Sequence, residues 1–161
     1  MKAEASITPL ADLTDVLSQQ DRFMGLDVGT KTIGLALASL STSVATPLKT
    51  LLRRKYKDDI IMLKSLISEW EVRGLVFGLP LNMNGTEGAR VQATKTVARN
   101  IARDTHLPYC FQDERLSSSA ATDRMIALGI KPSARDRVID AHAAQIILEG
   151  YMLRVKNALA K

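Results

Sequence analysis

The stretch from Phe23 to Ala38, FMGLDVGTKTIGLALA, constrains the fold of this chain more than any other. An apolar run leads into DVGTK, after which apolar residues return at every second position, as Ile33, Leu35 and Leu37. Alternation with a period of two is typical of a β-strand, and the preceding apolar run indicates a buried strand. Together they predict a hairpin, with Gly29 in its turn because glycine adopts backbone conformations that strain other residues.

Two features of this hairpin bear on function. Asp27 ends its first, interior strand. An unpaired buried charge is costly or shifts its pKa, so a compensating partner is expected, and a metal ion is the leading candidate. On the second strand Gly34, Ala36 and Ala38 share one face, and their small size allows a helix or another chain to approach closely.

Beyond the hairpin, the pattern predicts elements in the order β-β-β-α-β-α-β-α-α. The elements expected after the hairpin are a strand at 46–52, a helix capped by Asp58 or Asp59, a strand at 74–79, a helix capped by Thr86, a strand at 109–112, a helix at 117–128 ending at Gly129, and a helix at 133–158. Strands that alternate with helices need right-handed parallel crossovers. The sequence therefore predicts an α/β fold, a mixed sheet of three antiparallel strands followed by parallel strands, with helices on both faces.

Length and composition set the wider limits. A chain of 161 residues fits one domain, predicted at 22–158, after an extension at 1–21 in which Thr8 and Pro9 begin a short amphipathic helix. The net charge of +5 favours an anionic partner, with nucleic acid ahead of a membrane surface. The single Cys110 excludes an internal disulfide and a cysteine metal site. No apolar run reaches the ~18 residues of a membrane span, and no secretory segment is seen, so we expect a cytoplasmic protein that does not bind membranes.

Carboxylates stand at the ends of three predicted elements. Asp27 ends the first strand, Glu114 follows the last strand, and Asp140 lies near the start of the final helix on its apolar face. We expect all three to converge at one edge of the sheet, where oxygen ligands suit Mg²⁺ or Mn²⁺. Each also has an ordinary structural alternative: a turn hydrogen bond for Asp27, pairing with Arg115 or helix capping for Glu114, and a favourable helix-terminus charge for Asp140.

Four motifs occur in one order along the chain. They are GLDVGTKTIG at 25–34, GLPLNMNG at 78–85, DERLSS at 113–118 and DAHAA at 140–144. Together they resemble the YqgF (RuvX) family, proteins assigned to pre-16S rRNA processing and related to Holliday junction resolvases. The resemblance implies an RNase H-like fold and a metal-dependent nuclease site with Asp27, Glu114 and Asp140 as catalytic residues and metal ligands. The segment 38–41, ASLS, departs from the family because it lacks the Ser-Asp that often follows the second strand.

The resemblance implies a phosphodiesterase that processes the 5′ end of pre-16S rRNA, either free or within the small ribosomal subunit particle. We expect the protein to act as a monomer or weak homodimer. The side chains expected to contact the substrate are Lys31, Asn82, Asn84, Arg115, Lys95 and Arg99. Lys95 and Arg99 equally fit a solvated helix face. Two other functions stay open: a Holliday junction resolvase, which needs a dimer that presents two sites, and an RNA-binding assembly factor that does not cut.

Overall fold

A computed structural model describes residues 8–114, 123–130 and 132–159, the last range with side chains from residue 139 onward. Its strands form one five-stranded sheet in the order β3-β2-β1-β4-β5. The elements are β1 (Arg22–Val28), β2 (Thr32–Ser39), β3 (Thr46–Leu52), α2 (Tyr56–Glu69), β4 (Val72–Leu79), α3 (Ala89–Thr105), β5 (Tyr109–Asp113) and α5 (Pro132–Leu159). The first three strands are antiparallel, and β4 and β5 run parallel to β1. The predicted mixed sheet is confirmed.

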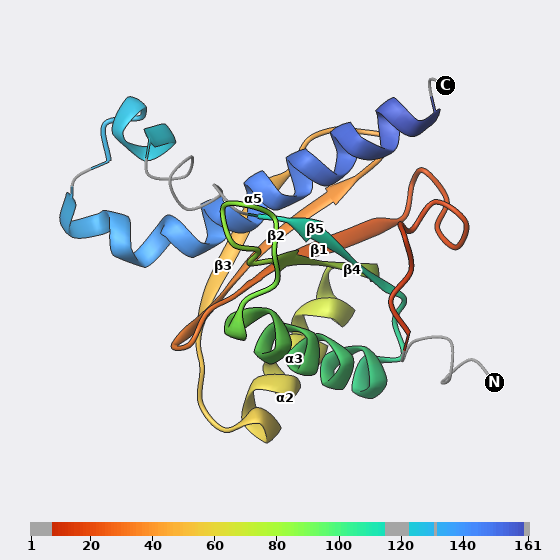
Figure 1. The fold of residues 1–161 in the computed structure, drawn as a ribbon, viewed down its shortest axis with the longest axis horizontal. Coiled ribbons are helices and arrows are strands. Elements are labelled where there is room, and N and C mark those ends of the chain that lie inside the picture. The colour runs from red at the N-terminus through yellow and green to blue at the C-terminus, as the bar shows by residue number, and fades with distance from the viewer. Residues whose placement is uncertain (1–7, 115–122, 131, 160–161) are drawn as a thin grey trace.

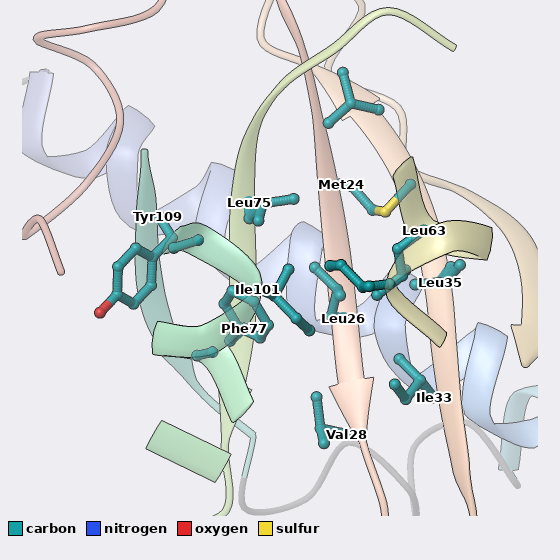
Figure 2. Close-up of a cluster of buried hydrophobic side chains, with 14 of the residues drawn as sticks. Met24, Leu26, Val28, Ile33, Leu35, Leu63, Leu75, Phe77, Ile101 and Tyr109 are labelled. Carbon is teal, nitrogen blue, oxygen red and sulfur yellow. The ribbon is translucent and has the colours of Figure 1, made fainter. Parts of the chain in front are cut away.

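Helices cover both faces of the sheet. α2 and α3 lie against one face and α5 against the other (Figure 1). The core on the first face joins apolar side chains of the strands to Leu63 of α2 and Ile101 of α3, and Figure 2 shows them packed together with Leu26 and Phe77. Burial of this apolar surface is the main favourable term in folding. In the described part of the chain, no helix is long and apolar enough to cross a bilayer.

The central strand β1 sends alternate side chains to the two faces. Met24, Leu26 and Val28 belong to the core under α2 and α3, whereas Phe23 belongs to the core under α5. Since side chains along a strand alternate with a period of two, Asp27 lies on the same face as Phe23. Asp27 therefore faces α5 from the carboxyl end of the central strand.

Residues 8–21 pack onto the domain. The predicted amphipathic helix is wrong: this segment contains turns and one parallel bridge between Leu10 and Cys110. The Leu10 N–H donates to the carbonyl oxygen of Tyr109 at 2.8 Å, and the Leu13 N–H donates to Oη of Tyr151 at 2.9 Å. The N–H groups of Leu10 and Leu13 are thus paired with the edge of β5 and with α5.

Both predicted helix caps are corrected. α2 begins at Tyr56, so Asp58 and Asp59 lie within the helix and do not precede it. The Asp59 carboxylate accepts a hydrogen bond from the N–H of Arg54 at 3.0 Å. α3 begins at Ala89 after Gly88, which makes no side-chain cap. The Thr86 hydroxyl instead donates to Oδ1 of Asn84 at 2.6 Å and belongs to the loop.

The role predicted for Gly29 also changes. Gly29 is not among the described residues with a positive φ, so the turn does not need glycine's left-handed conformation. Its N–H donates to the carbonyl oxygen of Thr32 at 2.8 Å. A Cβ at position 29 would lie 3.2 Å from that oxygen, so the glycine is explained by close approach across a tight turn. By contrast Gly129, predicted to end a helix, has φ of 75°.

Candidate active site

An open cleft of about 630 Å³ lies where β1 and β4 end. All three predicted carboxylates, Asp27, Glu114 and Asp140, line it. The other lining residues are Gly29, Thr30, Lys31, Thr32, Pro80, Leu81, Asn82, Gly88, Ala89 and Arg90. Residues from β1, the β1–β2 turn, the loop after β4, the start of α3, the end of β5 and α5 thus meet in one place.

Strand register brings Asp27 and Asp140 together. Asp27 lies directly across the ladder from Gly34, so positions 27 and 34 face the same side of the sheet. A Cβ at Gly34 would lie only 1.9 Å from the backbone carbonyl oxygen of Asp140. The absent side chain therefore lets α5 touch β2 at Asp140, as the small-residue face of the second strand predicted.

Glu114 is fixed by the end of β4. Its N–H donates to the carbonyl oxygen of Leu79 at 3.2 Å, which extends the β4–β5 pairing by one bond past β5. A Cβ at Gly78 would lie 2.8 Å from Oε2 of Glu114. The missing side chain at position 78 leaves the space that the glutamate occupies, so the GLP motif has a steric reason to begin with glycine.

Asp140 receives a further contact from the β1–β2 hairpin. The hydroxyl of Thr32 donates to Oδ2 of Asp140 through a short hydrogen bond. Thr32 is the first residue of β2, two positions before Gly34. One short strand segment therefore determines both where the α5 backbone lies and how the Asp140 carboxylate is oriented.

The carboxyl group of Asp27 has a raised pKa. Burial is the largest cause of the increase above the ordinary value of 3.8, and the hydrogen bond with Glu114 acts next, in the opposite direction. The negative charge of Asp140 raises the pKa further, while the positive charge of Arg90 lowers it. Asp27 thus lies against a second acidic side chain and near the negative charge of a third, a setting that favours binding of a cation.

This pKa shift predicts how stability depends on pH when divalent ions are chelated. Folded protein keeps the Asp27 proton to a higher pH than the unfolded chain, so this stabilising contribution is complete below about pH 4 and is lost as pH rises through the raised pKa. We expect the Asp27→Asn protein to lack this loss. Urea unfolding at a series of pH values in EDTA measures it, and parallel pH profiles for the two proteins would contradict it.

The donor set fits a hard divalent cation. All three side chains supply carboxylate oxygens, the ligands that Mg²⁺ and Mn²⁺ prefer. Asp27 is also buried and close to the negative charge of Asp140, which a cation would offset. Among the described residues, no three His, Cys, Asp or Glu side chains are already arranged as a metal-ion cage. The three carboxylates line the same cleft but do not surround a common point. Asp27 is hydrogen-bonded to Glu114, and Asp140 is hydrogen-bonded to Thr32.

The structure brings some of the predicted substrate-binding residues to the cleft and leaves others elsewhere. Lys31 and Asn82 line it. Asn84 orders the loop instead, since its Oδ1 accepts hydrogen bonds from the Thr86 hydroxyl and N–H. Lys95 forms an ion pair with Glu87 at 3.2 Å, and neither Lys95 nor Arg99 is among the described residues that line the cleft. Arg115 lies outside the described residues.

Two cleft residues were missed by the sequence reasoning. Thr32 carried no signal beyond its place after the turn, because its partner Asp140 is far away in sequence. Arg90 carried a signal that was not used. It stands in the first turn of α3, where the helix dipole disfavours a cation, and an unfavourable residue at a helix end suggests a role outside the helix.

Comparison with known proteins decides the family. A model described as "RuvX: Holliday junction resolvase" matches residues 21–154. The chain belongs to the RuvX family. A relative from Beijerinckia indica, named "Putative pre-16S rRNA nuclease", is 42% identical over 92% of this chain and 90% of its own length. A relative of the same name from Bradyrhizobium diazoefficiens is 41% identical over 95% of each chain.

Solved structures extend the likeness of this RuvX protein at the level of the fold. Thermus thermophilus RuvC in complex with a Holliday junction substrate matches with a TM-score of 0.52 and 14% identity, over 84% of this chain and 96% of that one. The fowlpox virus Holliday junction resolvase matches with a TM-score of 0.51 and 9% identity, over 83% and 99%. The predicted RNase H-like fold is confirmed by these two likenesses and by the sheet order.

Proposed function

We propose that this RuvX protein is a metal-dependent nuclease that cleaves phosphodiester bonds of the 16S rRNA precursor at its 5′ end. One observation carries the proposal: carboxylates from β1, from the residue after β5 and from α5 line a single open cleft. The names of the relatives support pre-16S rRNA as the substrate. We place its action in the cytoplasm, on RNA presented within the small ribosomal subunit particle, by a monomer or weak homodimer.

The chain's residues would divide the work by charge. Asp27, Glu114 and Asp140 would hold Mg²⁺ or Mn²⁺, and such an ion supplies Lewis-acid stabilisation of the attacking and leaving oxygens. Thr32 keeps the Asp140 carboxylate oriented through its hydroxyl. Lys31, exposed on the β1–β2 turn at the rim of the cleft, supplies positive charge to a nonbridging phosphate oxygen. Asn82 offers an amide to the sugar-phosphate backbone.

Hydrolysis itself needs a water molecule to add to phosphorus while the bond to the 3′ oxygen breaks. The leaving 3′ oxygen takes up one proton, and the products carry a 5′-phosphate and a 3′-hydroxyl. The acidic wall, which consists of Asp27, Glu114 and Asp140, orients this exchange because the sheet holds two of its members in place. Strand pairing positions Asp27, and the Leu79 carbonyl oxygen positions Glu114. Preorganised charge costs no rearrangement during the reaction.

A two-substrate assay tests the proposal. Purified protein is incubated with a 5′-extended 16S precursor and, separately, with a four-way DNA junction, each with Mg²⁺, Mn²⁺ or EDTA. We expect cleavage of the RNA only when a divalent ion is present. Cleavage of the junction alone would replace the proposal with junction resolution. RNA binding without cleavage, for the free precursor and also for the precursor within the small ribosomal subunit particle, would replace it with an assembly factor.

A further inference from the structure

The cleft is lined by side chains of both charges. Asp27, Glu114 and Asp140 form the acidic wall, while Lys31 and Arg90 contribute positive charge to the same cleft. A pocket built only to hold divalent cations has no use for cationic side chains, because they compete with the ions electrostatically. The presence of cationic side chains in the cleft therefore requires its own explanation, above all for Arg90.

Local structure gives Arg90 little reason to be where it is. It is the second residue of α3, at the positive end of the helix dipole, where a cation is disfavoured. The first turn of α3 contains no acidic residue, and Gly88 makes no side-chain cap, so nothing within that turn offsets the charge. Arg90 is also exposed, which excludes a packing role for its side chain in the core.

The contacts of Arg90 leave most of its donors for a ligand. Within the described part of the chain, its one hydrogen bond runs from Nη2 to the carbonyl oxygen of Val28 at 3.4 Å, longer than the ~2.9 Å typical of such bonds. Arg53 provides a comparison, because its Nη1 donates to the carbonyl oxygen of Gly29 at 2.7 Å. Arg53 secures the turn, whereas the guanidinium of Arg90 is loosely held at the end of β1, where its positive charge acts on Asp27.

We infer that Arg90 binds a nonbridging phosphate oxygen of the nucleic-acid strand in the cleft, next to the acidic wall. A guanidinium presents five donors in a planar fork that matches phosphate, and one weak bond to Val28 leaves that fork available. The phosphate then lies between Arg90 and the carboxylates, where a cleavable bond has to lie. This inference rests on the proposed function, because it assumes a nucleic-acid substrate.

The test measures binding rather than cleavage. A fluorescein-labelled single-stranded RNA with the precursor 5′ sequence is titrated with wild type, Arg90→Gln, Arg90→Lys and Arg73→Gln in EDTA across a salt series. Arg73 is the matched control, since it is exposed at the opposite end of β4 from the cleft. Urea unfolding of each variant checks that the fold is retained.

We expect Arg90→Gln to weaken binding about tenfold, as the loss of a hydrogen bond to a charged group does. It should also reduce the magnitude of the salt slope by about 0.7, the value for one phosphate contact on a single strand. Arg90→Lys should keep the slope and recover part of the affinity, because it retains the charge without the planar fork. Arg73→Gln should leave both quantities unchanged.

If Arg90→Gln binds the RNA with unchanged affinity and unchanged salt slope, the inference is overturned. The remaining role of Arg90 would be its electrostatic effect on the pKa of Asp27. Arg90-dependent binding by a protein that cuts neither RNA nor junction would support the inference while overturning the nuclease proposal. The same Arg90 dependence on a four-way DNA junction, with no RNA binding, would support phosphate binding and overturn RNA as the substrate. If wild type binds neither nucleic acid, both proposals fail.

Discussion

Replacing Asp27 by Asn is expected to slow cleavage on the order of 10³-fold or more while leaving the fold intact. Asparagine keeps the shape of the side chain but removes its charge. The acidic wall then loses the carboxylate that interacts with both Glu114 and Asp140. Losing one preorganised electrostatic contact to a transition state costs ~10²–10³-fold, and here the same change also weakens cation binding. Single-turnover cleavage of the precursor RNA with saturating Mg²⁺ measures it.

The size of this effect separates a catalytic carboxylate from a structural one. Asp58→Asn is the matched control, because Asp58 is exposed on the first turn of α2 and should change the rate less than twofold. Binding of Mn²⁺, followed by its paramagnetic resonance signal, should weaken in Asp27→Asn and not in Asp58→Asn. Metal-dependent cleavage at the normal rate by Asp27→Asn would show that Asp27 is not a catalytic residue.

Patterns that repeat along the chain predicted most of the fold. The alternation of Ile33, Leu35 and Leu37 fixed the face of β2, and all three pack in or against the core that α2 and α3 cover. Apolar runs ending in polar residues located the carboxyl ends of β1 and β5, and with them Asp27 and Glu114. The meeting of Asp27 and Glu114 follows from such positions, because the carboxyl ends of parallel strands lie at one edge of a sheet. The order of the strands across the sheet was not predicted.

The parts that were missed depend on contacts between residues remote in sequence. Thr86 has the chemistry of a helix cap, but its hydroxyl bonds to Asn84 and α3 starts later, at Ala89. Leu10 and Leu13 have helical spacing, but the edge of β5 and Tyr151 take their backbone groups. Local propensity is a weak prior that tertiary packing overrides, and neither competing partner is visible from the local sequence.

Gly34→Ala is expected to destabilise the protein by about 3 kcal/mol and to abolish most activity, because overpacking a rigid contact is costly. The new Cβ would lie 1.9 Å from the carbonyl oxygen of Asp140, 2.2 Å from its carbonyl carbon and 2.8 Å from the N of Ala141. All three are backbone atoms, so no side-chain rotation relieves the clash. Urea unfolding and the cleavage rate measure the two effects.

The same argument explains why stability and activity should fall together. To accept a methyl group at position 34, α5 has to move away from β2, and Asp140 moves with it, away from Asp27 and from the Thr32 hydroxyl. Gly150→Ala is the matched control. The three atoms nearest its Cβ would all belong to the side chain of Gln112, the first at 3.3 Å, and alanine favours a helix interior by ~0.5–1 kcal/mol. Wild-type stability in Gly34→Ala would mean that α5 does not contact β2 at Asp140. Asp140 would then not belong to the acidic wall.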